Sequence, residues 1–192
     1  MRTAEITRKT KETDIALTLG LDGGDVRVDT GVGFFDHMLE ALAMHGGFGL
    51  TLDVKGDLKV DAHHTVEDAG IALGAAFRQA LGDKAGIARY GSFFAPMDEA
   101  LAFAAADLSG RPFLVYDVGV REQKTGDFDT GLGLEFWRAF AYNAGITLHI
   151  RLEYGANAHH SLEAVFKAAA HALKAAAKIE NTGILSTKGV LA

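Results

Sequence analysis

The sequence predicts an α+β fold made of a duplicated strand-strand-helix-strand-helix unit, with sheets packed on one side of a layer of helices. Three observations predict it. Segments with strand-like alternation are interleaved with segments of helical periodicity. The order of these segments in the first half of the 192 residues returns in the second half. A block of two histidines and a glutamate, His-His-x-x-Glu, begins at His63 and recurs 96 positions later at His159.

The first half contains two expected strands, a helix, a strand and a helix. Alternation in "DIALTLGLDG" predicts a strand that ends in a turn at 22–24, and "VRVDTG" is expected to pair with it as a hairpin. The segment "GFFDHMLEALAMHGG" predicts a helix that stops at a glycine pair. A strand, "FGLTLDVKGD", and a longer helix, "DAHHTVEDAGIALGAAFRQALGD", follow.

The second half repeats this order. Two strands are expected in "ALAFAAADLSGRPFLVYDVGV", around a turn near 109–110. They are followed by a helix in "LGLEFWRAFAYNAG", a strand in "ITLHIRLEYG" and a final helix in "NAHHSLEAVFKAAAHALKAAAK". We therefore expect one domain, 1–192, made of two pseudo-repeats at about 1–90 and 91–192.

Composition excludes several classes of protein. The formal net charge of −6 argues against a nucleic-acid-binding protein. The chain has no cysteine, so disulfides, thiolate metal sites and a cysteine nucleophile are excluded, and any metal must be held by histidine and carboxylate. The polar N-terminal segment has no apolar signal region, and the apolar runs are too short to cross a membrane. We expect a cytoplasmic protein.

The two histidine pairs are expected in the first turns of helices. Asp61 and Asn157 stand two residues before the respective pairs, and both residue types are good N-caps. The helix dipole disfavours a protonated imidazole in a first turn. A neutral imidazole is the form that binds metal.

Spacing indicates two ions rather than one. Glu67 is four residues after His63 and three after His64, so it can share a helix face with either. Adjacent helical residues point about 100° apart, so the two histidines are expected to contact different ions. The same argument applies to the block formed by His159, His160 and Glu163. Histidine with carboxylate suits Mn, Fe, Ni or Zn. The alternative is a structural role at the helix starts that was kept after duplication.

The chain resembles a known family in four segments and over essentially its whole length. These segments are "FFDHMLEALAMHG", "DAHHTVEDAGIALG", "NAGITLHIRLEYGANAHHSLEAVFKA" and "STKGVL", and they are similar to imidazoleglycerol-phosphate dehydratases of histidine biosynthesis. The resemblance implies halves like domain 2 of ribosomal protein S5. It also implies dehydration of imidazole glycerol phosphate to imidazole acetol phosphate, two Mn²⁺ ions per active site, and a homo-oligomer of 24 subunits built from trimers.

The resemblance also implies the metal ligands. One ion would be held by His37, His64, His159 and Glu163, and the other by His63, Glu67, His160 and the residue at 135. Several family members have histidine at this last position, whereas this chain has Glu135. A glutamate oxygen is a hard donor that can still bind Mn²⁺.

Catalytic and substrate-binding residues are implied in the same way. Glu12, Glu67 and Glu163 are the expected catalytic carboxylates, with Glu12 or Glu67 moving the proton. Guanidinium and ammonium groups suit a phosphate. The expected substrate contacts are Glu12, His37, His45, His63, Glu67, Arg89, Arg111, His159, Lys167, Ser186, Thr187 and Lys188.

Two other functions fit the same ligands. A dinuclear metal hydrolase would release inorganic phosphate from a phosphate ester. A non-catalytic metal-binding assembly protein would bind the ion and turn nothing over. Outside the family motifs, Asp98 and Glu99 are expected at a turn or a helix start, and His171 at the surface.

Overall fold

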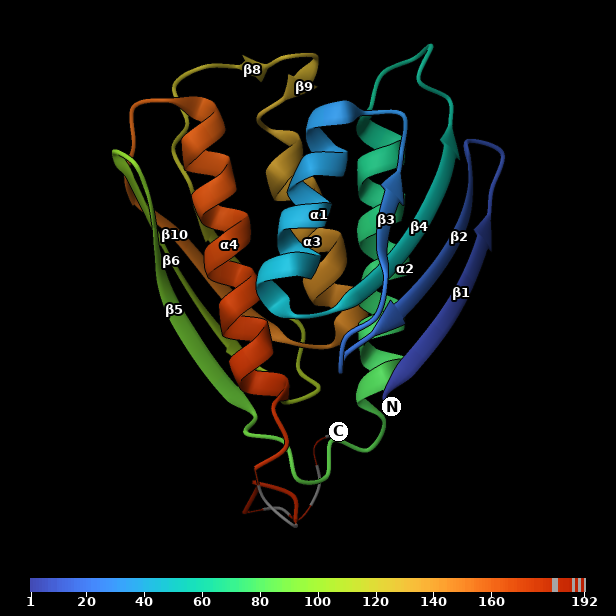
Figure 1. Cartoon of the computed structure of the whole chain (residues 1–192), viewed down its shortest axis with the longest axis vertical. Coiled ribbons are helices and arrows are strands. Elements are labelled where there is room, and N and C mark those ends of the chain that lie inside the picture. The colour runs from blue at the N-terminus through green and yellow to red at the C-terminus, as the bar shows by residue number, and fades with distance from the viewer. Residues whose placement is uncertain (181–182, 188, 190, 192) are drawn as a thin grey trace.

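Two four-stranded sheets flank four helices (Figure 1). The structure is a computed structural model that describes residues 1–180, 183–187, 189 and 191. The first sheet and its two helices come from the first half of the chain, and the second sheet and its helices from the second half. The α+β class predicted from the sequence is confirmed.

The first unit contains four strands and two helices. These are β1 (Thr3–Lys9), β2 (Thr13–Gly20), β3 (Val26–Asp29), α1 (Gly33–Gly46), β4 (Gly49–Gly56) and α2 (His63–Leu81). The strand order in the sheet is β1-β2-β4-β3. The first two pairings are antiparallel, and β3 lies parallel to β4.

The second unit has the same arrangement. It contains β5 (Tyr90–Met97), β6 (Ala100–Asp107), β7 (Phe113–Asp117), α3 (Leu132–Ala144), β10 (Thr147–Tyr154) and α4 (Ala158–Ala177). The order β5-β6-β10-β7, again with two antiparallel pairings and one parallel pairing, repeats that of the first sheet. A small hairpin, β8 (Lys124–Thr125) with β9 (Phe128–Asp129), is inserted before α3. This shared topology supports the interpretation of the chain as two pseudo-repeats.

Two expectations about the strands are wrong. The segment 26–29 does not form a hairpin with the strand before it, because it crosses to the far side of β4 and pairs there in parallel. In the second unit, β7 pairs in parallel with β10 in the same way. Each unit also has an additional first strand, β1 or β5, that was not expected. The strand β1 is short and lies at the edge of its sheet, and only one of its residues, Ala4, is buried, which conceals it in the sequence.

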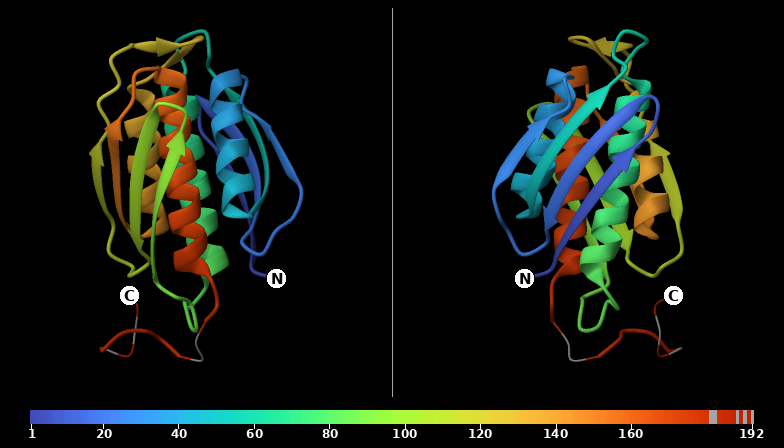
Figure 2. Two further views of the ribbon diagram at one scale, coloured as in Figure 1. Left: turned by 60° about the vertical axis from the view of Figure 1, so that its left-hand side comes forward. Right: turned by 90° about the vertical axis from the view of Figure 1, so that its right-hand side faces the viewer.

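The helices lie between the two sheets rather than on one outer side of them, as the turned views show (Figure 2). Helix α2 covers β1 and β2, while α4 covers β5 and β6. The units then join through their helices, because α2 packs on α3 and α1 packs on α4. A helix layer that is apolar on both sides is thereby shielded from water by both sheets.

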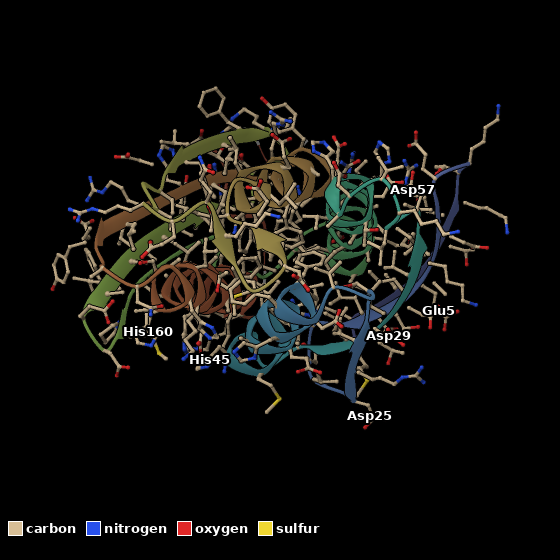
Figure 3. The ribbon with its side chains drawn as sticks, turned by 90° about the horizontal axis from the view of Figure 1, so that it is seen from above. Glu5, Asp25, Asp29, His45, Asp57 and His160 are labelled. Carbon is tan, nitrogen blue, oxygen red and sulfur yellow. The ribbon has the colours of Figure 1, made fainter. Side chains whose placement is uncertain are left out.

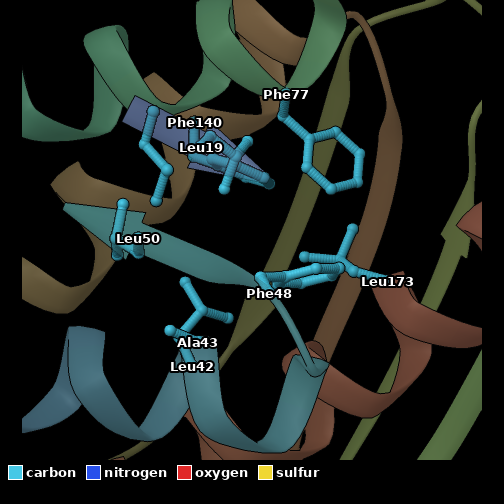
Figure 4. A pocket seen from close by; sticks show the side chains of 9 residues that line it. Leu19, Leu42, Ala43, Phe48, Leu50, Phe77, Phe140 and Leu173 are labelled. Atoms are coloured by element: carbon cyan, nitrogen blue, oxygen red, sulfur yellow. The ribbon is translucent and has the colours of Figure 1, made fainter. Parts of the chain in front are cut away.

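The core is continuous across both units. Leu19 and Leu50 of the first sheet meet Phe77 of α2, Phe140 of α3 and Leu173 of α4 around one apolar space (Figure 4). The two units therefore depend on each other for the burial of these side chains. Among the described residues, no helix is both long and apolar enough to cross a membrane.

All four helices begin at the same end of the molecule, at the top of Figure 1. The N-terminus and the end of α4 lie at the opposite end. Residues in the first turns of different helices are therefore brought together, although they are far apart in the sequence.

Candidate metal and substrate site

Three predicted ligands meet between α1 and α4. His37 lies in the second turn of α1, and His159 and Glu163 lie one turn apart at the start of α4. Glu163 Oε2 is 3.7 Å from His37 Nε2 and 3.3 Å from His159 Nε2. One ligand atom from each residue lies within 4.8 Å of the others, and among the described residues this is the one group of three with such geometry. Two imidazoles and a carboxylate form a donor set that fits a divalent cation.

The carboxylate of this group is held in its charged form. Burial alone would raise the pKa of Glu163, but the hydrogen bond from Lys167 and the positive charges near it lower this pKa below its usual range. Lys167 Nζ lies 2.7 Å from Glu163 Oε1, one helical turn further along α4. One oxygen therefore faces the lysine, and the other faces the two imidazoles.

A similar arrangement begins in the first unit. His63 Nε2 and Glu67 Oε2 are 3.6 Å apart at the start of α2, as the i,i+4 spacing predicts. The counterpart of His37 is Glu135, because each lies ten residues before the left-handed glycine that ends its helix. The Glu135 carboxylate pairs with Arg138 on the same helix. Its negative charge is therefore partly neutralised before any cation arrives.

His64 points to a different set of carboxylates from its neighbour His63. Its Nδ1 is 3.1 Å from both oxygens of Asp57. Its Nε2 is 3.8 Å from Glu12 Oε1, in the turn between β1 and β2. The hydrogen bond with Asp57, and then the charge of Glu12, raises the pKa of His64. Adjacent histidines thus diverge, as the helical geometry predicts.

His160 is held in the same way in the second unit. Its Nδ1 is 2.7 Å from Glu99 Oε2, and its Nε2 is 3.7 Å from Asp98 Oδ2. Glu99 raises the pKa of His160, and the same hydrogen bond lowers the pKa of Glu99 to about 2. Seen from above, His160 and Asp57 lie on opposite sides of the molecule (Figure 3). The histidine pairs therefore form two separate clusters on one chain.

The capping prediction is confirmed for one helix only. Asn157 is the N-cap of α4, and its side chain accepts a hydrogen bond from the His160 amide. Helix α2 begins one residue later relative to its aspartate, so its N-cap is Ala62 and no side chain caps it. Asp61 instead accepts a hydrogen bond from the His63 amide at 2.8 Å.

His45 lies near the end of α1, two turns from His37 on the same face. Its Nδ1 is 3.3 Å from His171 Nε2 on α4, and the His171 ring stacks on Phe93 at 4.2 Å between centroids. Burial lowers the pKa of both histidines. The sequence suggested that His171 is a surface residue. It is instead a half-buried contact between α1, α4 and β5.

Most predicted phosphate contacts lie at the opposite end of the molecule from the histidines. Asp107, at the end of β6, forms ion pairs with Arg89 Nε at 2.7 Å and with Arg111 at 3.3 Å. Arg89 also donates to the Leu185 carbonyl at 2.7 Å, which brings Ser186 and Thr187 to the same end. Lys188 lies outside the described residues. Lys167 is an exception, since it contacts Glu163 near the histidines.

The two ends are too far apart for one small molecule. Helix α4 runs from the histidine end to the arginine end and contains 20 residues, which corresponds to about 30 Å. A substrate with a ring, three carbons and a phosphate cannot reach both ends of one chain. The predicted site residues therefore form two groups within a chain.

Sequence reasoning missed Asp57 and Glu99 as partners of His64 and His160. Both looked like ordinary loop or turn residues. One sequence feature could have revealed Glu99: it stands immediately before β6, as Glu12 stands immediately before β2. Asp57 gave no comparable indication, because its contact with His64 depends on the path of the loop after β4.

Comparison with known proteins gives a consistent result. A family model described as imidazoleglycerol-phosphate dehydratase matches residues 30–173. Proteins named imidazoleglycerol-phosphate dehydratase are similar to this chain in Symbiobacterium thermophilum (58% identical, covering 99% of this chain and 93% of that protein) and in Acetivibrio thermocellus (55% identical, covering 99% of both).

Solved structures agree with these matches. The crystal structure of imidazoleglycerol-phosphate dehydratase from Staphylococcus aureus superimposes with a TM-score of 0.84 at 38% identity, over 94% of this chain and 99% of that one. The enzyme of Pyrococcus furiosus, in complex with (S)-C348, gives a TM-score of 0.85 at 38% identity, over 97% of this chain and 100% of that one.

Proposed function

This chain belongs to the imidazoleglycerol-phosphate dehydratase family, hydro-lyases of histidine biosynthesis, and from that premise we propose that it converts D-erythro-imidazole glycerol phosphate to imidazole acetol phosphate with two Mn²⁺ ions per active site. The observation that carries the proposal is the convergence of His37, His159 and Glu163. A biosynthetic, cytoplasmic setting accompanies this function.

The donor atoms support manganese. Imidazole nitrogen and carboxylate oxygen without thiolate suit a borderline to hard divalent ion that accepts many ligands. One ion would be held by His37, His159 and Glu163, with His64 as a further ligand. The other would be held by His63 and Glu67, with His160 and Glu135 as further ligands.

The active site would be completed by a neighbouring subunit. His64 and His160 point away from the three-residue group of their own chain, toward Asp57 and Glu99. The arginine end lies about one helix length from the histidine end. A homo-oligomer, which we propose is a 24-mer built from trimers, would bring the arginine end of one subunit to the histidine end of another.

In the reaction, a carbon-bound proton and the neighbouring hydroxyl leave the substrate. When bound, the divalent cation supplies a Lewis acid that stabilises a deprotonated ring nitrogen. Glu12 is an exposed carboxylate that faces His64 Nε2 at 3.8 Å, so it is the group best placed to move the proton. Glu67 and Glu163 instead lie beside His63 and His159, where they would serve as metal ligands. Arg89, Arg111, Lys167 and the segment 186–188 would bind the phosphate and orient the ring.

The direct test is dehydration of imidazole glycerol phosphate by metal-stripped protein, with and without added Mn²⁺. Both imidazole acetol phosphate and free phosphate are assayed. The expected result is ketone product that depends on Mn²⁺, with no free phosphate. Release of phosphate would identify a hydrolase, and bound Mn²⁺ without either product would identify a non-catalytic metal protein.

A separate test addresses the assembly. Light scattering would give the particle mass before and after chelation of the metal. Because each site would be shared between subunits, removal of the metal is expected to release trimers. A particle of unchanged mass after complete chelation would show that the metal does not hold the assembly together.

A further inference from the structure

Two glutamates occupy equivalent places in the two units and have different surroundings. Strands β2 and β6 each contain eight residues and pair in antiparallel register with β4 and β10. Glu12 immediately precedes β2, and Glu99 immediately precedes β6. Each faces the second histidine of the nearby pair, His64 or His160. The duplication therefore places one carboxylate near each of these rings.

Glu99 is fully engaged by hydrogen bonds. Its Oε2 is 2.7 Å from His160 Nδ1. Its Oε1 accepts from the amides of Ala156 and Asn157 at 3.2 and 2.8 Å. With Nδ1 occupied, the remaining nitrogen of His160, Nε2, is the one that can bind a cation, because the hydrogen bond at one ring nitrogen decides which nitrogen is free.

Glu12 makes no comparable set of contacts among the described residues. Its side chain is 53% exposed, and its nearest charged partner is His64 Nε2, at 3.8 Å. The Nδ1 of that ring is occupied by Asp57 instead. The orienting role that Glu99 has in the second unit thus belongs to Asp57 in the first.

The lengths of two loops explain why Asp57 orients the ring in the first unit and Glu99 in the second. Asp57 is in the connection between β4 and α2, which contains the six residues 57–62. The equivalent connection between β10 and α4 contains only the three residues 155–157, and its sequence Gly-Ala-Asn has no carboxylate. The longer loop supplies the orienting group in the first unit, while the shorter loop leaves that role to Glu99.

The turn that carries Glu12 is fixed independently of its carboxylate. Asp68 on α2 accepts a hydrogen bond from Thr13 and pairs with Arg8 at 2.8 Å, so it holds both strands of the β1–β2 hairpin. Among the described residues of the second unit, this polar anchor has no counterpart. The equivalent positions there are the buried alanines Ala95, Ala100 and Ala164.

We propose that Asp57 and Glu99 are positioning residues that present Nε2 of His64 and of His160 to the cations. The inference rests on the proposed function, because it assigns these carboxylates by their effect on the same metal site. The two equivalent glutamates then have different roles, since Glu99 acts on cation affinity through His160 and Glu12 acts on turnover.

The test compares Asp57→Asn, Glu99→Gln and Glu12→Gln, with Glu5→Gln on the outer face of β1 as the matched control. The Mn²⁺ dissociation constant is measured from the electron paramagnetic resonance signal of the free ion, and kcat is measured at limiting and at saturating Mn²⁺. Loss of an orienting partner weakens metal binding by about 10- to 100-fold. We expect that weakening for Asp57→Asn and Glu99→Gln, with kcat largely restored by saturating Mn²⁺.

Glu12→Gln and Glu5→Gln are expected to bind Mn²⁺ as the unchanged protein does. Glu12→Gln should lower kcat by about 100-fold or more, and saturating Mn²⁺ should not restore it. Unchanged affinity in both Asp57→Asn and Glu99→Gln would overturn the inference, and so would a loss of affinity in Glu12→Gln equal to that in Glu99→Gln.

Two further measurements keep the test decisive. Circular dichroism identifies a variant that does not fold, and in that case Asp57→Glu or Glu99→Asp replaces it, with affinity expected to recover toward that of the unchanged protein. An unchanged protein that binds Mn²⁺ but produces no ketone would contradict the proposed function, while the affinities would still decide whether Asp57 and Glu99 orient the rings.

Discussion

His160 Nδ1 and Glu99 Oε2 lie 2.7 Å apart, and this pair connects the β5–β6 turn to the first turn of α4. The same glutamate accepts hydrogen bonds from two backbone amides in the connection before α4. One carboxylate therefore fixes a ring, a turn and a helix start together. Its charge state should matter to the stability of the metal-free protein as well as to metal binding.

The first prediction concerns acid stability. The hydrogen bond with His160 and those from the backbone lower the pKa of Glu99 to about 2, from an ordinary value of 4.5. A carboxyl group whose pKa is lower in the folded state than in the unfolded state stabilises the fold. This stabilisation is complete above the pKa of the unfolded state and is lost as the pH falls through the pKa of the folded state. The free energy of unfolding of the metal-free protein, measured with urea, should therefore fall less between pH 4.5 and about pH 2 in Glu99→Gln than in the unchanged protein. Equal losses would contradict the prediction.

The second prediction concerns Glu163. Glu163→Gln removes the negative charge that faces two imidazoles and leaves Lys167 without its partner at 2.7 Å. A cation at this site should bind at least about 100-fold more weakly, since both a ligand charge and the local charge balance are lost. Metal analysis after gel filtration should show one Mn²⁺ per chain instead of two. Glu153→Gln, on β10, is the control and should retain both.

The third prediction separates the two arginines bound to Asp107. The Arg89 side chain is only 12% exposed and also holds the Leu185 carbonyl, whereas Arg111 is 65% exposed. Both Arg89→Ala and Arg111→Ala should raise KM for the phosphorylated substrate, because each removes a guanidinium. Only Arg89→Ala should also lower Tm, by several degrees, because it leaves the partly buried Asp107 carboxylate and the Leu185 carbonyl without this donor. A Tm loss in Arg111→Ala of the same size would be inconsistent with this division.

The fourth prediction concerns Arg138, the partner of Glu135. An exposed ion pair of this kind contributes at most about 1 kcal/mol, so competition with a cation is limited to roughly fivefold in affinity. Arg138→Gln should therefore tighten binding of the Mn²⁺ that Glu135 is proposed to hold, by a factor of up to about five. Glu135→Gln should weaken it. Titration calorimetry measures both, and weaker binding in Arg138→Gln would mean that Glu135 is not available to the metal.

The fifth prediction concerns the packing of β5 on α4. A Cβ added at Gly91 would lie 2.1 Å from the Ala172 carbonyl oxygen and 2.7 Å from the Ala176 amide nitrogen. These are backbone atoms of a buried helix, so they cannot move aside locally. Gly91→Ala should reduce the free energy of unfolding by about 1–3 kcal/mol or more. Gly119→Ala meets no atom within 4 Å and should change it little.

The sequence was sufficient for the elements with strong periodicity. All four helices were predicted within a few residues, because glycines stop α1 and α3 and the histidine blocks mark the starts of α2 and α4. The strands β4 and β10 were predicted because their residues alternate between buried and more exposed positions.

The sheet edges were not predictable from local patterns. Strand β3 follows β2 in the chain, which favoured a hairpin, but it pairs with β4 because the crossover allows its apolar residues to cover α1. Such pairings depend on contacts between segments distant in the sequence. The site shows the same division: i,i+4 pairs such as His63 with Glu67 follow from helical spacing, whereas the carboxylates that hold His64 and His160 come from other elements.

The separation of the histidine end from the arginine end has a genetic consequence. If each active site takes one end from each of two neighbouring chains, damage at Glu163 and damage at Arg111 fall in different halves of a shared site. Two impaired alleles, one with each lesion, would then assemble some sites in which both contributing ends are intact. Co-expression should give more activity than either allele gives alone. Two residues that are far apart on one polypeptide would in this way act together in one active site.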